Sequence, residues 1–145
     1  MLSVPGFNFT WADEIRFRDL DALAHVNNGS YLVYLESARL AWWLHVTRRP
    51  VGMAALDMML ANVAIDFRSP LFWGESVEVG VRCASMGRTS FQMEFQVRDA
   101  ASGRVAADAR KVCVYYDFAA GRKLELTGEL RAWIRAQDPG VRENL

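Results

Sequence analysis

The segment Tyr31–Val46, YLVYLESARLAWWLHV, decides the fold. Its apolar residues recur at spacings of three and four, and its alanines and leucines favour helix, so the pattern predicts one long α-helix. Polar residues are few, chiefly Glu36, Ser37, Arg39 and His45, so apolar side chains cover more than one face of this helix. We therefore expect the helix to lie at the centre of the hydrophobic core.

The segments on both sides of this helix show the period of two that is typical of strands with one buried face. A first strand is predicted from Phe7 to about Arg18. Four more strands are predicted after the helix, at residues 63–67, 77–83, 91–97 and 105–116. Turn sequences such as SMGRT and DAASGR separate these strands, so short connections would join the four into an antiparallel meander. Pro50 and Gly52 end the long helix, and a short helical stretch is predicted over Met53–Leu60.

The C-terminal segment TGELRAWIRAQ is amphipathic and predicts a helix, with Thr127 as the expected N-cap and Pro139 after its end.

The order of strand, long helix and four strands predicts an α+β fold, an antiparallel sheet packed on one helix. A chain of this length is expected to form a single domain over residues 1–145. Such a sheet leaves edge strands exposed, and pairing with a second copy hides an edge, so we expect a homodimer.

Composition excludes several classes of protein. Of the 145 residues 52% are hydrophobic, and 17 Lys and Arg balance 17 Asp and Glu, so nothing indicates binding to nucleic acid or to an anionic membrane. Cys83 and Cys113 lack the close spacing of a metal site and the density of a disulfide scaffold, so we expect buried thiols and no metal. The N-terminus does not resemble a signal peptide, and no segment has the length of a membrane span, which predicts a cytoplasmic protein.

The segment Arg18–Asn28, RDLDALAHVNN, places two aspartates, a histidine and two asparagines directly before the long helix. In the structural interpretation, Asp19 and Asp21 end the first strand and one of four residues caps the helix: Asn27, Asn28, Gly29 or Ser30. In the functional interpretation, a carboxylate lies beside the unpaired N–H groups of a helix start, where it could act on an acyl carbonyl whose oxygen those groups hold. We assign Asp19 to loop structure, the usual role of a turn aspartate.

The pattern D-x-D-x-x-x-H-V-N-N-x-x-Y followed by Y-L-E-x-A-R resembles the opening signature of the hotdog-fold thioesterases of the 4-hydroxybenzoyl-CoA thioesterase type. The later strand segments and the closing GELRAWI are similar to that family in order and spacing, so the resemblance covers nearly the whole chain. It implies the hotdog fold, an antiparallel sheet wrapped around one long central helix. It also implies an acyl-CoA thioesterase that forms a homodimer or homotetramer, with active sites at the dimer interface and no cofactor beyond the coenzyme A of the substrate.

The resemblance also implies roles for single residues of this loop. Asp21 would act on the thioester carbonyl as nucleophile or as general base for water. The backbone N–H that polarises the carbonyl oxygen would be that of Asn28, or of its neighbours Asn27 and Gly29. His25 would orient the substrate or Asp21, or else pin the loop as a structural histidine, and the residue types leave both roles open.

The sequence departs from related thioesterases at two positions of the loop. Leu23 stands where plant acyl-carrier thioesterases of this fold have an asparagine, so the role of that asparagine is absent. Ala24 stands where many relatives have a glycine just before the histidine.

The turn SMGRTS would bind the substrate beside Tyr31 of the signature. By the resemblance this turn runs along the pantetheine arm and nucleotide of coenzyme A, with Arg88 on phosphate and Thr89 and Ser90 on the pantetheine amides. An ordinary polar hairpin is the alternative. An acyl carrier protein could replace coenzyme A as the carrier of the acyl group.

Glu36 is the other acid to consider, because a nearly apolar helix rarely keeps a buried glutamate without a partner. We expect it to pair with Arg39 or a loop amide, and it would be the next catalytic acid to test if Asp21 proved dispensable. Two other functions share this fold class: hydratase or dehydratase chemistry, for which no matching segment is found, and acyl binding without turnover.

Overall fold

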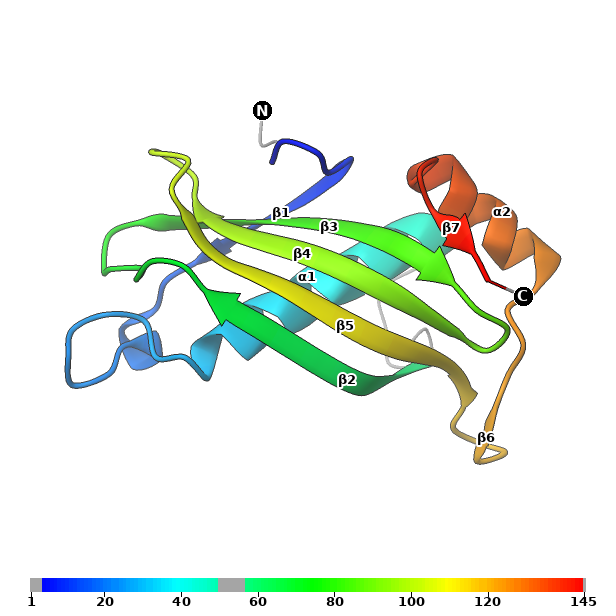
Figure 1. The fold of residues 1–145 in the computed structure, drawn as a ribbon. Coiled ribbons are helices and arrows are strands. Elements are labelled where there is room, and N and C mark those ends of the chain that lie inside the picture. The colour runs from blue at the N-terminus through cyan, green and yellow to red at the C-terminus, as the bar shows by residue number, and fades with distance from the viewer. Residues whose placement is uncertain (1–3, 50–56, 145) are drawn as a thin grey trace.

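The computed structural model describes residues 4–49 and 57–144, and it consists of one curved antiparallel sheet wrapped around a long helix (Figure 1). The strands are β1 (Phe9–Glu14), β2 (Met58–Phe67), β3 (Ser76–Met86), β4 (Ser90–Asp99), β5 (Val105–Asp117), β6 (Arg122–Lys123) and β7 (Arg142–Glu143). The helices are α1 (Ser30–Thr47), α2 (Gly128–Gln137) and the short 3-10 turn η1 (Phe17–Asp19). The predicted α+β layout is therefore confirmed.

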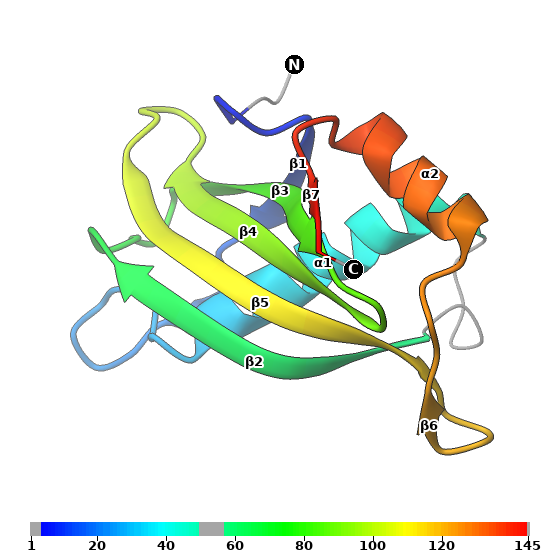
Figure 2. The ribbon, with the colours of Figure 1, turned by 45° about the vertical axis from the view of Figure 1, so that its right-hand side comes forward.

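The strand order in the sheet is β1-β3-β4-β5-β2, with β6 added to β5 and β7 added in parallel to β3. The predicted meander holds for β3, β4 and β5 and is wrong for β2, which pairs with β5 at the far edge of the sheet (Figure 2). The connection from β2 to β3 is anchored at Leu71, which is buried and accepts a hydrogen bond from the N–H of Val26 at 2.8 Å. This anchor holds the connection against the loop before α1.

Helix α1 lies against the concave face of the sheet, as its sequence predicts. Its buried side chains are Tyr31, Tyr34, Leu35, Ala38, Trp42, Trp43, Val46 and Thr47. The ring of Trp43 stacks on that of Phe91 in β4, with centroids 5.5 Å apart and planes 3° from parallel. Stacking of large aromatic rings adds to the free energy gained by burying their area, so this contact ties the helix firmly to the sheet.

Two predicted elements differ in the structure. The short helix predicted over residues 53–60 is wrong at its end, because Met58 begins β2, and its residues 53–56 lie outside the described residues. The first strand ends at Glu14, opposite the first residue of β3, rather than near Arg18. Phe17 consequently leaves the sheet and is exposed in the 3-10 turn. The prediction extended the strand too far because Ile15 and Phe17 continue the alternation of apolar residues, although β3 has no residue left to pair with them.

Helix α2 and the two cysteines agree with the sequence-based expectations. The side chain of Thr127 caps α2 by accepting a hydrogen bond from the N–H of Leu130 at 3.1 Å. Cys83 and Cys113 are buried free thiols. Among the described residues, no helix is long and apolar enough to cross a membrane.

The loop between β1 and α1 is held by Asp19. Its carboxylate accepts hydrogen bonds from the N–H of Arg16 at 2.9 Å and from the hydroxyl of Tyr34 at 2.7 Å. Its carbonyl accepts hydrogen bonds from the N–H of Asn27 at 2.8 Å and from the hydroxyl of Ser30 at 3.1 Å. Burial and the neighbouring Asp19 raise the pKa of Tyr34 far above its ordinary value, so the phenol stays a donor. The structural role predicted for Asp19 is confirmed.

Residues 21–25 form a tight turn in which one position favours glycine. The N–H of Ala24 donates to the carbonyl of Asp21 at 3.1 Å, and the N–H of Asp21 donates to the carbonyl of His25 at 2.9 Å. Ala24 itself has φ of 64°, in the left-handed region. A turn followed by a left-handed residue is a common short hairpin connection, and glycine is its usual occupant. Alanine at position 24, where many relatives have glycine, therefore strains the backbone and lowers the stability of the fold.

We expect Ala24→Gly to raise the free energy of unfolding by about 0.5–1 kcal/mol, because glycine adopts this conformation without the clash of a Cβ atom. Urea denaturation measures the change. Ala22→Gly is the matched control in the same turn, because Ala22 does not have a positive φ and should lose stability on the same substitution. Loss of stability in both variants would contradict the assignment of strain to Ala24.

Candidate active site

Asp21 and His25 lie side by side on the loop before α1. One carboxylate oxygen of Asp21 accepts a hydrogen bond from the N–H of Leu23 at 2.9 Å, which fixes the orientation of the side chain. The other oxygen lies 3.4 Å from Nδ1 of His25. Both side chains are about three-quarters buried, with 23% of Asp21 and 30% of His25 exposed. The structure thus brings these two predicted site residues together as an Asp–His pair within reach of solvent.

Asn28 lies at the start of α1, between residues whose backbone N–H groups have acceptors in the described chain. The N–H groups of Asn27, Gly29 and Ser30 donate, respectively, to the carbonyl of Asp19, the side-chain oxygen of Asn27 and the carbonyl of Asn27, at 2.8–2.9 Å. No acceptor for the N–H of Asn28 is found in residues 4–49 and 57–144. Gly29 occupies the N-cap position, one of the four expected, but no side chain caps the helix there. A helix start with a free N–H favours an anion or a polarised carbonyl oxygen.

A pocket of about 240 Å³ lies between this helix start and the end of β2. Its lining consists of His25, Val26, Asn28, Tyr31, Phe67, Arg68, Ser69 and Pro70. Tyr31 is buried in its wall, with its ring edge-on to Phe67 at 5.1 Å, and burial raises the pKa of its phenol. His25 therefore contacts Asp21 on one side and the pocket of Asn28 and Tyr31 on the other.

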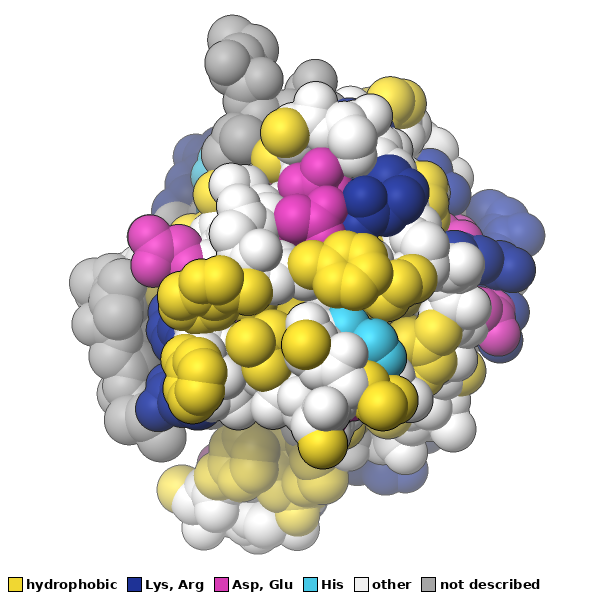
Figure 3. Space-filling view, turned by 90° about the vertical axis from the view of Figure 1, so that its left-hand side faces the viewer, with side chains coloured by type: hydrophobic (Ala, Val, Ile, Leu, Met, Phe, Trp, Pro, Cys, Tyr) yellow, Lys and Arg dark blue, Asp and Glu magenta, His cyan; other side chains and the backbone are white. Residues whose placement is uncertain are grey.

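Apolar side chains surround this loop on the molecular surface. Figure 3 looks onto this end of the molecule and shows apolar side chains gathered around a histidine. Phe17 and Leu23, 79% and 75% exposed, are the most exposed of a group that also includes Phe72 and Trp73. The rings of Phe17 and Trp73 meet edge-on at 6.3 Å. This surface is not predicted from the sequence, because the alternating pattern assigns Phe17 to a buried strand face. Exposed apolar patches of this kind mark sites where ligands or partners bind.

Arg88, Thr89 and Ser90 do not join this site within one chain. They lie at the turn between β3 and β4, at the end of the sheet opposite the start of α1 (Figure 1). The Arg88 guanidinium pairs with Glu125 at 3.3 Å, and both side chains are exposed. The carbonyls of Arg88 and Thr89 accept hydrogen bonds from Leu126 and Tyr115. Within one chain these residues could bind a ligand together, but that ligand would be remote from Asp21.

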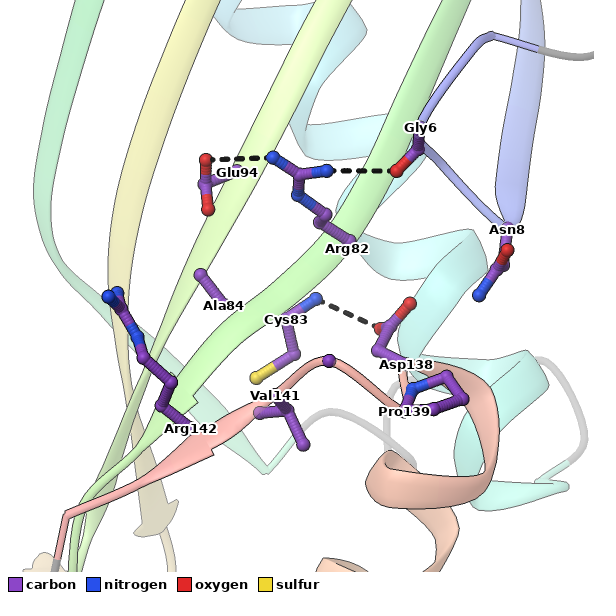
Figure 4. A pocket seen from close by; sticks show the side chains of 11 residues that line it. Gly6, Asn8, Arg82, Cys83, Ala84, Glu94, Asp138, Pro139, Val141 and Arg142 are labelled. Carbon is purple, nitrogen blue, oxygen red and sulfur yellow. Dashed lines mark hydrogen bonds and ion pairs between the residues drawn. The ribbon is translucent and has the colours of Figure 1, made fainter.

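A second pocket, of about 360 Å³, lies where α2 and β7 meet the sheet, and its polar groups bond to one another (Figure 4). Arg82 bridges Glu94 at 3.2 Å and the carbonyl of Gly6 at 2.9 Å. The carboxylate of Asp138 accepts a hydrogen bond from the N–H of Cys83 at 2.9 Å, in a stretch of β3 that β1 no longer pairs. Burial raises the pKa of Asp138. We interpret this pocket as structural, since its carboxylate completes the edge of a strand.

Glu36 forms the predicted pair with Arg39, and it has a second partner that the sequence does not predict. Its Oε2 lies 2.5 Å from Nη2 of Arg39, and its Oε1 lies 2.5 Å from Nζ of Lys111 in β5. Lys111 follows Ala107 and Ala109 in the alternation of β5, so its position on the inward face could have been found from the sequence.

Among the described residues, no group of three or more His, Cys, Asp and Glu side chains could hold a metal ion.

Comparison with known proteins gives the family. Residues 15–134 match the family model of the thioesterase-like superfamily. The long-chain acyl-CoA thioesterase FadM of Escherichia coli K12 is 29% identical over 122 residues, which cover 81% of this chain and 90% of FadM. Protein THEM6 of Danio rerio is 31% identical over 97 residues, but the match covers only 46% of THEM6.

A solved structure agrees with these relatives. A thioesterase of Thermus thermophilus, crystallised with coenzyme A and zinc, is 33% identical and superposes with a TM-score of 0.81, covering 93% of this chain and 97% of that one. The match to the family model takes in the Asp21 loop, α1 and strands β2 to β6. The chain belongs to the thioesterase-like superfamily, a family of thioester hydrolases.

Proposed function

We propose that this protein hydrolyses an acyl-CoA thioester to the free acid and coenzyme A. The observation that carries the proposal is the N–H of Asn28, which has no acceptor among the described residues and lies at a pocket beside the Asp21–His25 pair. A donor fixed before the reaction begins is what stabilises the oxyanion of an acyl-transfer reaction. The relatives support the choice of substrate, since FadM is a long-chain acyl-CoA thioesterase and the Thermus thioesterase was crystallised with coenzyme A.

In the proposed reaction the thioester carbonyl oxygen accepts a hydrogen bond from the N–H of Asn28. The carboxylate of Asp21 removes a proton from an attacking water, and the carbonyl carbon becomes tetrahedral with its negative oxygen at the helix start. Collapse of this intermediate breaks the carbon–sulfur bond, and the departing thiolate of coenzyme A takes up a proton. His25 holds the second oxygen of Asp21 toward the pocket. Direct attack by Asp21 on the carbonyl is the alternative course, through an anhydride with the acyl group.

The proposed active enzyme is a homodimer joined along β2. Strand β2 pairs with β5 on one side, and no strand among the described residues pairs with its other side. The backbone groups on that outer edge of β2 are therefore available to pair with a second copy. If the two β2 strands pair antiparallel, the sheet of the partner subunit runs in the opposite direction to the sheet of the first subunit. The partner subunit's Arg88 would then lie at the same end as Asp21, where it could reach the phosphates of coenzyme A.

Asp21→Asn should lower kcat by about a hundredfold or more, because the amide keeps the size of the carboxylate and cannot accept the proton. A thiol-release assay over short, aromatic and long acyl-CoA and acyl-carrier thioesters measures it. Glu129→Gln makes the same change from carboxylate to amide on the exposed surface of α2, away from β2, and as the matched control it should keep full activity. An unchanged rate in Asp21→Asn would overturn the assignment of the base, and saturable binding without release of thiol would support an acyl-binding protein instead.

A single turnover in oxygen-labelled water tests for the anhydride course. Water activated by Asp21 puts the label into the product acid and none into the protein. An anhydride that water opens at the Asp21 carbonyl leaves the label on Asp21 and returns an unlabelled oxygen to the product, so label on Asp21 would establish direct attack.

Arg88→Ala should raise KM for acyl-CoA several-fold and leave KM unchanged for the matching acyl-pantetheine, which lacks the nucleotide phosphates. Steady-state kinetics with both thioesters test this. Arg122→Ala removes an exposed arginine from the neighbouring strand β6 and should change neither value. Equal effects of Arg88→Ala on both thioesters would show that the arginine does not bind the nucleotide.

Light scattering should give a particle of about twice 16.4 kDa or a multiple of that dimer. Specific activity should fall on dilution together with the dimer, because a monomer lacks the partner's part of the coenzyme A site. A monomer with full activity at every concentration would contradict the proposed assembly.

A further inference from the structure

A charged cluster lies midway along α1, in surroundings that are otherwise apolar. The Lys111 side chain is 0% exposed, and its ammonium lies 5.6 Å from the ring centroid of Phe95. Burial lowers the pKa of Lys111, against the opposing effect of Glu36. Arg39 approaches the same carboxylate from α1 itself and lies 3.8 Å from the sulfur of Cys113. The two cations hold one carboxylate, Lys111 from the sheet and Arg39 from the helix.

Glu36 is the member of this cluster that solvent reaches. Its side chain is 46% exposed, while Lys111 is completely buried beneath it. Burial would raise the pKa of Glu36, but the hydrogen bonds and charges of Lys111 and Arg39 outweigh it, and the pKa lies below its ordinary value. A carboxylate has about four acceptor positions, and the two cations use one on each oxygen. The remaining positions face outward as a fixed, charged acceptor.

The exposed side of Glu36 lies in a strip of apolar side chains that continues from the active-site pocket. We call this strip the α1–β2 surface, and it consists of Leu32, Val33, Val63 and Phe67, all partly exposed. Phe67 also lines the pocket of Asn28, and Val63 lies opposite Lys111 in the sheet register. The surface therefore leads from the proposed oxyanion donor to Glu36. Helix geometry puts Glu36 about 12 Å beyond Asn28 along the axis, a distance that a chain of octanoyl length spans together with the hydrogen bonds at its carbonyl and at a terminal hydroxyl.

A ligand that covers this surface must replace the water that hydrogen-bonds to the carboxylate of Glu36. A plain alkyl chain would take water from the carboxylate and offer no hydrogen bond in return, which costs binding free energy. A second carboxylate would be repelled by Glu36, because both nearby cations are already engaged by it. A hydroxyl can donate to the open acceptor positions and replace the lost water. Sites built to bond a substrate hydroxyl discriminate strongly against the analogue that lacks it.

We propose that Glu36, held between Lys111 and Arg39, selects acyl thioesters that carry a hydroxyl near the end of a medium-length aliphatic chain. The inference rests on the proposed thioesterase function and adds to it the class of acyl group. Glu36 acts here as a specificity residue that touches the acyl chain far from the reacting carbonyl. Lys111 and Arg39 act through Glu36 by fixing its charge and orientation.

The test compares kcat/KM for octanoyl-CoA, its ω-hydroxy, ω-methoxy and ω-carboxy derivatives, and butyryl-CoA, whose chain is too short to reach Glu36. The wild-type protein should prefer the ω-hydroxy thioester over octanoyl-CoA by about tenfold, as expected for one hydrogen bond to a charged acceptor. The ω-methoxy thioester should show no such preference, because it keeps the oxygen and lacks the O–H donor. The ω-carboxy thioester should be the poorest substrate of the series.

The double variant Glu36→Leu/Lys111→Met removes the carboxylate together with the completely buried charge of Lys111, and it leaves Arg39 as the one cation of the cluster. In this variant the ratio of kcat/KM for the ω-hydroxy thioester to kcat/KM for octanoyl-CoA should fall to about one. Glu94→Gln is the matched control, because Glu94 pairs with Arg82 in the second pocket, away from the α1–β2 surface, and it should keep the preference.

Equal kcat/KM for octanoyl-CoA and its ω-hydroxy derivative in the wild type would overturn this inference and leave the thioesterase proposal standing. Hydrolysis of no thioester would overturn both. Preference for the ω-carboxy thioester would assign recognition to the cations instead of Glu36 and would also overturn it. A change in particle mass in the double variant, with the preference retained, would assign Glu36 to the contact between subunits and reject its role toward the acyl chain.

Discussion

The carboxylate and carbonyl of Asp19 organise the whole end of the molecule that carries the site. Through them the end of β1, the turn of Asp21 and the first residues of α1 are joined by hydrogen bonds in a mostly buried position. Buried polar groups are costly unless they are paired, and these are paired on every side that the structure describes. Asp21 and His25 are positioned by the hydrogen bonds of their own turn, and Asp19 ties the two ends of that turn to the start of α1.

Much of the fold could be predicted from the sequence, because local pattern and tertiary environment agree over α1, β3, β4 and β5. The long helix is apolar on most of its faces, and apolar residues recur at every second position throughout β4 and over most of β3 and β5. Strand order could not be predicted in the same way. Nothing local to Met58–Phe67 says whether β2 pairs with β3 or β5, since that depends on where Leu71 anchors the following connection. The helix predicted over Met53–Leu60 failed at Met58 because short apolar runs fit helix and strand equally well.

In the candidate site, too, contacts within one short segment could be predicted from the sequence, and contacts between distant segments could not. The Asp–His contact and the free N–H at Asn28 follow from residues within one short segment, so a sequence motif could indicate them. The partnership of Glu36 with Lys111 joins residues 75 positions apart, and an alternating strand pattern says only that position 111 faces inward. The distance of Arg88 from Asp21 within one chain is likewise invisible in the sequence, because it depends on how the sheet is laid out (Figure 1).

The donor at the start of α1 belongs to the main chain, and this has a consequence for how the protein can vary and how it can be studied. Replacing the Asn28 side chain leaves the N–H in place, so an alanine scan through the loop would pass over the group that faces the pocket. Only proline, which has no N–H, would delete the proposed oxyanion donor. Any residue except proline at position 28 would keep this N–H. The identity of the side chain there is therefore a poor guide to whether a related chain keeps the donor.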